Sequence, residues 1–338
     1  MAATSQTGGH RPATNKGQRV SEPLAIITNR FSTRNLRGDD WIEPLVRDEK
    51  NVGHFLVEDV GAIPEVLRKC ADMGAETIVV NGGDGTADLV FAGLINHEPY
   101  ATPPALALLP AGKTNMTTAG WSLSGTPEVS LRHLLKFRQT GPLAHYAVER
   151  PVLGLHREGA REPLYGAFFG AAEVVDGILF CRRHIYPLKM PNALSHTAAI
   201  SLLLWRSMLS RRDNKSIEVF AEDHPVEHGS FFAVVVTALD QLLLGIRPEP
   251  DESSKDPLTY LSLRTGPYPT LRAVGSLASR RVGPGPGRTV RTANRVKLKF
   301  TGAYTLDGEL FEAKDNETLI LDGEKRLRFI RLPQGPEA

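Results

Sequence analysis

The sequence predicts an α/β domain with a parallel sheet, followed by a second domain of antiparallel strands. Up to residue 142, short apolar runs alternate with segments of helical periodicity, which is typical of βαβ units. Beyond Gly141-Pro142, short β-rich runs are separated by proline, glycine and aspartate, which favours antiparallel pairing. The 338 residues are enough for two domains, each with its own core.

In the first domain, the length and spacing of each apolar run indicate its secondary structure. Apolar side chains recur at helical spacing in residues 59–73, and Gly74 follows as a helix end. Further helices are expected through residues 89–95 and over 127–137. Buried strands are expected over residues 24–28, 77–80 and 105–109.

The second domain is expected to consist mainly of strands. One helix is expected over residues 195–210, and the proline- and glycine-rich residues 283–287 are expected to form a loop. The expected strands are residues 164–169, 216–220, 231–237, 258–264, 296–300, 303–306, 317–321 and 326–330.

Composition excludes several classes of protein. The net charge is only +2 and no basic tract is interleaved with aromatic residues, so nucleic acid is not an expected partner. No apolar run is long enough to span a membrane. The first 22 residues are polar, which predicts a disordered tail rather than a signal peptide. Cys70 and Cys181 lack metal-like spacing and are expected to be reduced thiols in a cytoplasmic protein.

The segment Ile78-Val79-Val80-Asn81-Gly82-Gly83-Asp84-Gly85-Thr86 predicts a phosphate-binding turn between a strand and a helix. Glycines let backbone N–H groups approach an anion closely, and the helix N-terminus adds a positive dipole. An ordinary strand-to-helix turn is the alternative, but it would need one glycine rather than three. Asp84 would repel a bare phosphate, so its presence suggests a magnesium ion or a proton to be moved.

A second glycine loop, Leu109-Pro110-Ala111-Gly112-Lys113-Thr114-Asn115-Met116, also follows a strand. It is not a P-loop, because Ala107 stands where that motif requires its first glycine. A plain turn with a solvated lysine remains the alternative for this loop alone. Two glycine loops at successive strand ends of one sheet nevertheless favour a joint nucleotide site.

Three motifs stand out together: Gly82-Gly83-Asp84-Gly85-Thr86, then Pro110-Ala111-Gly112 with Asn115, and finally Leu306-Asp307-Gly308-Glu309. In this combination they resemble the diacylglycerol kinase catalytic family, which includes soluble bacterial lipid kinases, sphingosine kinases and ceramide kinases. The resemblance spans residues 24–332. It implies a first domain like those of phosphofructokinase and NAD kinase, a second domain that is a β-sandwich, and ATP in the cleft between them.

The resemblance also implies the domain boundaries and the roles of residues. Residues 23–143 and 317–333 would form the ATP-binding domain, and residues 144–316 the lipid-substrate domain. Glu309 would be the general base, and Asp84 would lie near the metal or the acceptor hydroxyl. The cofactors would be ATP and Mg²⁺, with Asp84 and Asp307 as candidate metal ligands. The implied ATP-binding residues are Asn29, Gly82, Gly83, Gly85, Thr86, Gly112, Lys113, Thr114 and Asn115.

The acidic tetrapeptide occurs twice, since Leu321-Asp322-Gly323-Glu324 repeats it. In the family two further strands follow the motif, and only the first copy leaves room for them. Glu324 is therefore expected to be a hairpin residue. Asp-Gly is itself the leading hairpin signal, so a turn without chemistry is the alternative for Asp307-Gly308 as well.

The sequence departs from the family pattern at several positions. The family's first loop usually has Asn-Pro with a Ser-Gly pair, whereas this chain has Asn29-Arg30-Phe31-Ser32-Thr33-Arg34-Asn35. In the second loop, Lys113 replaces a threonine and Met116 an aspartate. An acid-glycine element that binds structural Mg²⁺ in some members has no clear counterpart. The motif from His224 to His228 matches a zinc-binding pattern in its letters, but Pro225 and Gly229 exclude the helix that it needs.

These observations lead to the expectation of an ATP- and Mg²⁺-dependent kinase that phosphorylates the primary hydroxyl of a membrane lipid, either diacylglycerol or a ceramide or sphingoid lipid. The enzyme would be cytoplasmic and peripheral at the inner membrane face, and a homodimer is left open. Apolar residues 202–209 would line the lipid pocket. Arginines near residues 280–295 would contact anionic lipid, with a solvated basic face as the alternative. The alternatives are a catalytically inactive lipid-binding module and an NAD kinase.

Overall fold

The computed structural model describes residues 22–37, 41–112, 117, 121, 123, 125–173, 175, 216–221, 226–242, 245–250, 256–266 and 280–333. Several expectations therefore lie outside the described residues. They concern the tail up to residue 21, Lys113 to Met116, Cys181, the helix at 195–210 with its apolar lining, and the pair His224-Pro225.

The first domain is built on a six-stranded sheet with the strand order β2-β1-β3-β4-β18-β5. All neighbouring strands are parallel except β5, which is antiparallel to β18. This confirms the parallel α/β domain expected from the sequence. The strands are β1 (Leu24–Asn29), β2 (Val52–Val57), β3 (Thr77–Gly82), β4 (Ala105–Pro110), β5 (Ala147–Pro151) and β18 (Arg326–Ile330).

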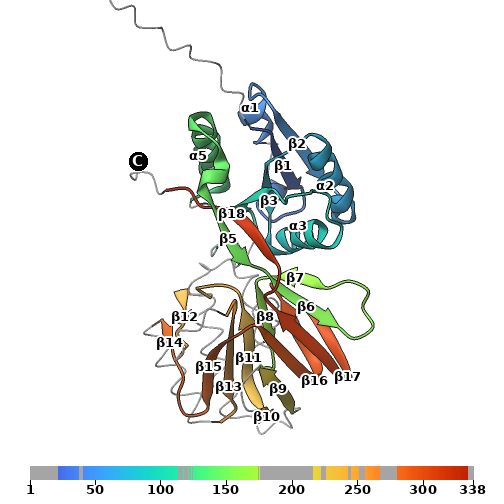
Figure 1. Cartoon of the computed structure of the whole chain (residues 1–338), viewed down its shortest axis with the longest axis vertical. Coiled ribbons are helices and arrows are strands. Elements are labelled where there is room, and N and C mark those ends of the chain that lie inside the picture. The colour runs from blue at the N-terminus through green and yellow to red at the C-terminus, as the bar shows by residue number, and fades with distance from the viewer. Residues whose placement is uncertain are drawn as a thin grey trace, which may run out of the picture.

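Helices cover both faces of this sheet, with α2 and α3 on one side and α5 on the other (Figure 1). Alternating strand residues supply the two apolar layers, since Ile27 and Val80 pack with α2 and α3, while Ile26 and Val79 pack with α5. Gly93 allows α3 to approach α2, because a Cβ there would lie 2.5 Å from Leu67 Cδ1. The helices are η1 (Asn35–Arg37), α1 (Glu43–Val46), η2 (Val60–Ala62), α2 (Ile63–Asp72), α3 (Asp84–Asn96), α5 (Pro127–Thr140) and η3 (Leu143–Tyr146).

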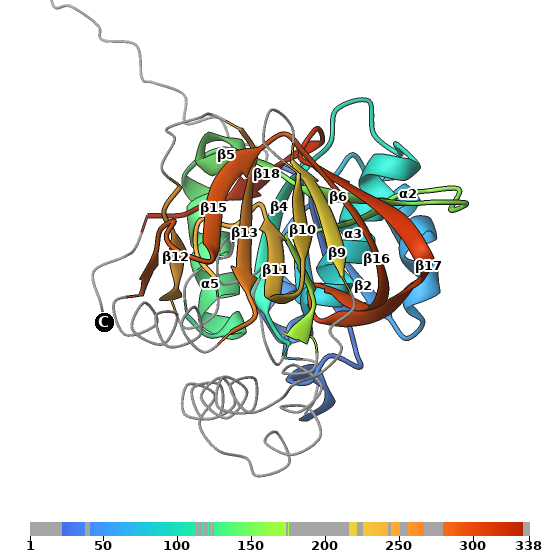
Figure 2. The ribbon, with the colours of Figure 1, turned by 90° about the horizontal axis from the view of Figure 1, so that it is seen from below.

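The second domain is a large antiparallel sheet of ten strands, which confirms the expected antiparallel pairing (Figure 2). Hydrogen bonds join its strands into one branched sheet, in which β16 pairs with β9 through its first half and with β8 through its last residues. The strands are β6 (Leu153–Arg157), β7 (Leu164–Gly166), β8 (Phe168–Ala171), β9 (Ile217–Ala221), β10 (Glu227–Gly229), β11 (Phe231–Thr237), β13 (Leu258–Arg264), β15 (Arg288–Ala293), β16 (Arg295–Leu306) and β17 (Glu309–Asp322). A separate short pair consists of β12 (Arg247–Pro248) and β14 (Arg281–Val282).

Several strand boundaries differ from the expectation. The runs at 296–300 and 303–306 form one strand, β16, whose register shifts between Phe300 and Gly302, so the glycine marks a bulge rather than an end. Conversely, the run at 164–169 is split at Ala167 into β7 and β8. Residues 317–322 still pair with β16 in the second sheet, so the chain re-enters the first sheet only at Arg326.

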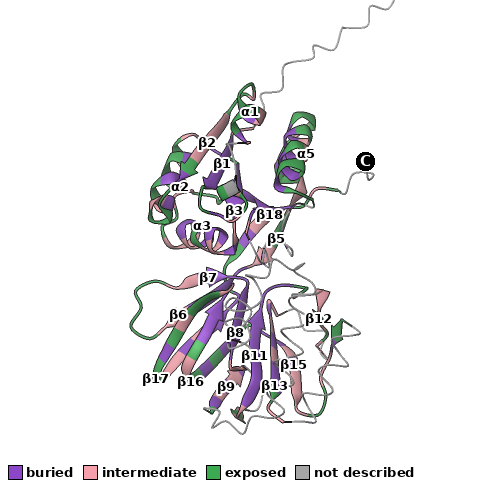
Figure 3. Cartoon of the chain, turned by 180° about the vertical axis from the view of Figure 1, so that it is seen from behind, coloured by how far each residue is buried: buried purple, intermediate pink, exposed green. Residues whose placement is uncertain are grey.

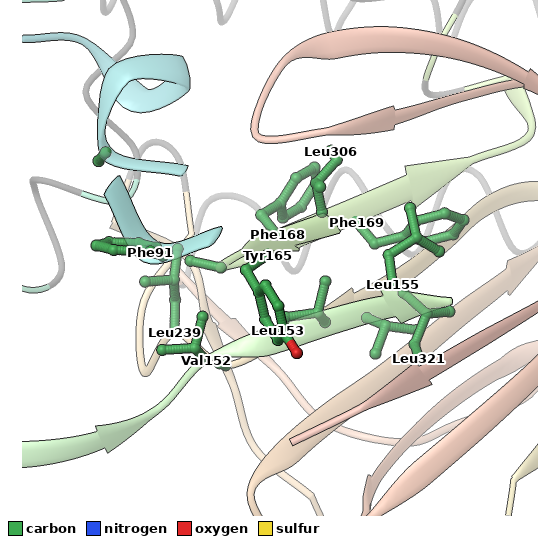
Figure 4. Packing of buried hydrophobic residues seen from close by; sticks show 14 of the residues in the cluster. Phe91, Val152, Leu153, Leu155, Tyr165, Phe168, Phe169, Leu239, Leu306 and Leu321 are labelled. Atoms are coloured by element: carbon green, nitrogen blue, oxygen red, sulfur yellow. The ribbon is translucent and has the colours of Figure 1, made fainter. Parts of the chain in front are cut away.

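The two sheets are joined by buried packing where the chain crosses between them. One apolar cluster runs from the helices α2 and α3 into the second sheet, and Figure 4 shows Phe91 of α3 near Val152 and Leu239. Strand β11 is buried along its whole length (Figure 3). Among the described residues, no helix is long and apolar enough to cross a membrane.

Candidate active site

The candidate site lies at the carboxyl edge of the first sheet, where β1, β3 and β4 each end in a loop. The carboxyl ends of parallel strands are where open α/β sheets usually bind ligands. The first loop follows Asn29, the second follows Gly82, and the third follows Pro110. The three loops are therefore adjacent because their strands are neighbours in the sheet.

The second and third loops touch through glycines. A Cβ added to Gly83 would lie 3.2 Å from Gly112 Cα, which is tighter than nine in ten real Cβ contacts. A Cβ on Gly82 would lie 2.5 Å from Thr86 Cβ. The structure thus brings together both glycine loops, as the sequence led us to expect, and leaves no room for side chains at these positions.

Helix α3 begins directly after this turn. Its N-cap is Gly83, which has no side chain with which to cap the first turn. The first N–H groups of a helix have no partners within the helix, and together with the helix dipole they favour an anion. A helix N-terminus between two touching glycine loops is an arrangement suited to phosphate.

The first loop is held against the others by hydrogen bonds. Asn29 uses both ends of its side-chain amide within the protein: Nδ2 donates to Thr86 Oγ1 at 2.9 Å, and Oδ1 accepts from the Phe31 amide at 2.9 Å. The Gly83 amide donates to Ser32 Oγ at 3.3 Å. Asn29 therefore fixes the relative position of two loops.

Asn35 and Asn81 form a second link between these loops. Asn35 Nδ2 donates to the backbone oxygen of Asn29 at 2.7 Å, and Asn81 Nδ2 lies 3.3 Å from Asn35 Oδ1. Arg30, in contrast, pairs with Glu58 at the exposed surface, with 2.8 Å between Nη1 and Oε1. The sequence analysis missed Asn35 and Asn81, because amide side chains in a polar loop carry no distinctive spacing.

Glu309 reaches this site from the other sheet. It is the first residue of β17, and a Cβ built on Gly85 would lie 2.7 Å from Glu309 Oε1. The turn before it has a positive φ at Asp307 (44°) and at Gly308 (89°), as a two-residue hairpin requires. The Asp-Gly signal thus marks a genuine hairpin, and that hairpin delivers the carboxylate to the glycine turn.

Asp307 is buried behind Glu309 and is 5% exposed. Its Oδ2 accepts a hydrogen bond from the Ala167 amide at 2.6 Å. Burial, followed by the nearby charge of Asp84, raises the pKa of Asp307 to about 7. A side chain at Gly166 would collide with this carboxylate.

Two further aspartates of α3 face the same interior. Asp84 is 7% exposed and its Oδ1 accepts from the Thr117 amide at 3.2 Å. Burial and then the charge of Asp307 raise the pKa of Asp88 well above its usual range. The sequence analysis missed Asp88, although its spacing of four residues from Asp84 places both on one helix face.

The carboxylates are suited to Mg²⁺ in their chemistry, because hard cations prefer oxygen ligands. Among the described residues, however, no three acidic, histidine or cysteine side chains converge so as to hold a metal ion by themselves. Mg²⁺ commonly takes only one or two carboxylates and completes its shell with phosphates and water. The residues present therefore fit a metal that arrives together with a nucleotide.

The second copy of the tetrapeptide lies elsewhere. Glu324 is exposed and pairs with Arg295, with 2.6 Å between Oε1 and Nη2. It does not lie in a hairpin as expected, because β17 and β18 belong to different sheets and residues 323–325 connect them. Of the zinc-like motif, Glu227 accepts a hydrogen bond from Ser262 Oγ at 2.9 Å, and His228 lies 3.1 Å from Ser216 Oγ.

The fold is shared with solved bacterial proteins. A candidate diacylglycerol kinase from Bacillus anthracis str. Sterne superimposes with a TM-score of 0.60 at 16% identity, over 91% of this chain and 97% of that chain. A diacylglycerol kinase from the same organism gives a TM-score of 0.58 at 14% identity, with the same coverage. At these sequence identities the similarity shows only that the fold is shared, and the shared fold includes both domains. No curated protein matches the sequence.

A family model matches the part of the chain that carries the three loops. It describes the diacylglycerol kinase catalytic domain and matches residues 23–142, so the hairpin with Glu309 lies outside the matched segment. The match includes both glycine loops and the start of α3. Residues 23–142 of this chain thus match the model of the diacylglycerol kinase catalytic domain family.

Proposed function

We propose that the protein is an ATP-dependent lipid kinase that phosphorylates the primary hydroxyl of a membrane lipid. The family is one of lipid kinases that use ATP. The observation that carries the proposal is that Glu309 lies against Gly85. A carboxylate of the second domain is thereby next to the glycine turn of the first domain, which is suited to binding phosphate. Phosphoryl transfer to an alcohol needs these two components next to each other.

The glycine loops would bind the nucleotide phosphates. The backbone of residues 82–85 and 112 offers close approach, and the N-terminus of α3 adds favourable dipole charge. Asn29 and Ser32 would act indirectly, since their hydrogen bonds to Thr86 and Gly83 hold the turn in shape. Lys113, Thr114 and Asn115 follow Gly112 in the sequence and are proposed to complete this nucleotide site.

Glu309 would accept the proton of the attacking hydroxyl. A base of this kind contributes about 10²- to 10⁴-fold in rate. Asp84 and Asp307 are the carboxylates that would each offer an oxygen to Mg²⁺ bound with ATP, and the metal would neutralise phosphate charge. Asp307 also holds the hairpin, because its Oδ2 accepts from the Ala167 amide.

The acceptor would be diacylglycerol or a ceramide or sphingoid lipid, reached by peripheral contact with the inner face of a membrane. We propose a cytoplasmic enzyme because ATP is a cytoplasmic substrate and no described helix crosses a bilayer. Anionic lipid would attract the enzyme through basic side chains, each worth about 1 kcal/mol near the surface.

Transfer of radiolabelled phosphate from ATP to a panel of lipids tests the proposal. The panel should contain diacylglycerol, ceramide and sphingosine, with NAD as a control acceptor, and we expect label on one lipid class. Label on NAD alone would assign the protein to the NAD kinases. Tight lipid binding without any transfer would identify an inactive lipid-binding module instead.

A further inference from the structure

A pocket of about 220 Å³ lies in the second domain, where β10, β13 and β15 meet the loop at residues 283–287. Three arginines line it: Arg264, Arg288 and Arg291. Glu227, Ser262 and Thr289 complete the polar part of the wall. None of these residues belongs to the candidate active site.

The pocket is at the opposite end of the sheet from that site. Along the pairing of β11 with β13, Arg264 is opposite Phe231 at one end, and Thr259 is opposite Thr237 at the other. Thr237 is in turn paired with Phe168, whose backbone oxygen accepts from the Asp307 amide at 2.8 Å. Five residues of strand correspond to roughly 17 Å, so the two sites are separate.

Two of the arginines, Arg264 and Arg288, are held in place by contacts within the protein. Arg264 Nη1 donates to the backbone oxygen of His228 at 3.4 Å, and its guanidinium lies 5.4 Å from the centre of the Phe231 ring. Arg288 Nε donates to the backbone oxygen of Gly283 at 2.6 Å. Fixed guanidinium groups lose less entropy on binding, and each is a planar fork of N–H donors.

The charge of the wall favours an anion. Among the described lining residues, three are arginines and one is a carboxylate, Glu227, which already accepts a hydrogen bond from Ser262 Oγ at 2.9 Å. Ser262 is 1% exposed. Arginine forks match the oxygens of phosphate, and the Thr289 hydroxyl lies in the same wall as a further donor.

We propose that this pocket binds a phosphate group, as a second anion site independent of the catalytic cleft. The ligand is a phosphate monoester or diester, and its source is either a lipid headgroup or a soluble phosphate compound. Both sources present the same chemistry to the arginines.

Only some of the arginines near residues 280–295, which the sequence indicated as a basic cluster, line the pocket. Arg281 pairs with Glu249 and Arg295 with Glu324, so these two arginines have acidic partners outside the pocket. Only Arg288 and Arg291 of that cluster line the pocket, and Arg264 joins them because Leu263 is paired with Arg288 across β13 and β15. Arg264 could not be assigned to this cluster from the sequence, because it lies far from residues 280–295 along the chain.

Calorimetric titration of the full chain with inorganic phosphate tests the site. We expect Arg264→Gln and Arg291→Gln each to weaken binding by about tenfold, as loss of a charge-assisted contact predicts. Glu227→Gln should tighten binding, because it removes the negative charge of the described pocket wall and can still accept from Ser262. Arg295→Gln is the matched control and should change nothing. Phosphate held at the glycine loops would be insensitive to all four changes, so equal affinities throughout would overturn the proposal.

Vesicle sedimentation separates the two sources. Vesicles of phosphatidylcholine alone are compared with vesicles that also contain phosphatidylglycerol. If Arg264→Gln abolishes the preference for the anionic vesicles, the ligand is a lipid headgroup. If the preference is unchanged while phosphate binding is lost, the ligand is soluble. No dependence on Arg264 in either measurement would contradict the site, and circular dichroism of each variant checks that the fold is intact.

Discussion

Glu309 Oε1 lies 2.7 Å from where a Cβ on Gly85 would stand, although the two residues belong to different sheets and are far apart in the sequence. The contact depends on two local features. The Asp307-Gly308 turn points the start of β17 at the first domain, and the missing side chain at Gly85 leaves space for the carboxylate. The predictions below test whether this relationship is the basis of catalysis.

Replacing Glu309 by Gln should lower kcat by about 10²- to 10⁴-fold, because the amide cannot accept the proton of the attacking hydroxyl. KM for ATP should change little, and the thermal unfolding midpoint should stay close to that of the parent. The matched control is Glu324→Gln, which alters the same tetrapeptide at the exposed pair with Arg295. Equal activity of the two variants in the lipid kinase assay would show that Glu309 is not the base.

Replacing Gly85 by Ala should separate stability from activity. Position 85 is in the first turn of α3, where alanine favours the helix by up to about 1 kcal/mol. The new methyl would displace the Glu309 carboxylate, so kcat should fall at least about tenfold. Denaturant unfolding and steady-state kinetics on the same sample measure both effects.

Two further variants make this second test specific. In the double variant with Glu309→Gln, the Gly85→Ala change should cost little more activity, because the group it displaces is already gone. Gly93→Ala on the same helix is the contrast: its methyl would press on Leu67 and should cost about 1–3 kcal/mol of stability. If the two losses of activity add up in the double variant, the effect of Gly85→Ala does not act through Glu309.

The first domain could be predicted from the sequence because its signals are local. Runs such as residues 24–28 and 105–109 are buried on both faces, so apolar content alone identified β1 and β4. Strand β2 was missed because it is an edge strand with mostly half-buried side chains, which gives no apolar run. Strand β5 was missed for a similar reason, since it is also at an edge of the sheet.

The site could be predicted only where motifs carry it. The glycine turn and Glu309 can be recognised because each belongs to a short sequence motif, and they lie next to each other in the structure. Asp88 and Arg264 could not be assigned a role in this way, because their surroundings come from other strands: Asp307 for the first, and Arg288 with Arg291 for the second. Charged residues without a motif have no distinctive signal until the sheet is assembled.

The Asn29→Ala variant should weaken nucleotide binding indirectly, because Asn29 holds the loops of the site by hydrogen bonds within the protein. It leaves Thr86 Oγ1 and the Phe31 amide without their partner, which costs about 1–3 kcal/mol of stability at a buried site. KM for ATP should rise because the first two loops lose one of the links between them. Arg30→Ala, one residue on, removes only an exposed ion pair and should change stability by less than about 1 kcal/mol. If both variants have the same KM for ATP, Asn29 does not position the loop.

Asp307→Asn should change how stability depends on pH. Burial and the charge of Asp84 raise the pKa of Asp307 from 3.8 to about 7, so the folded protein holds a proton there that the unfolded chain has already released. The stability that this proton provides is complete below about pH 4 and is lost as the pH rises through 7. The full shift corresponds to at most roughly 4 kcal/mol.

Asparagine is a suitable replacement because it tolerates the positive φ of this turn and can still accept the hydrogen bond from Ala167. Urea unfolding without divalent cations, at several values between pH 4 and 8, should therefore show a flatter stability profile for the variant than for the parent. At pH 8 the variant should be the more stable protein, because it no longer buries a charged carboxylate next to Asp84. Parallel profiles for the two proteins would mean that Asp307 has an ordinary pKa and is charged in the folded state.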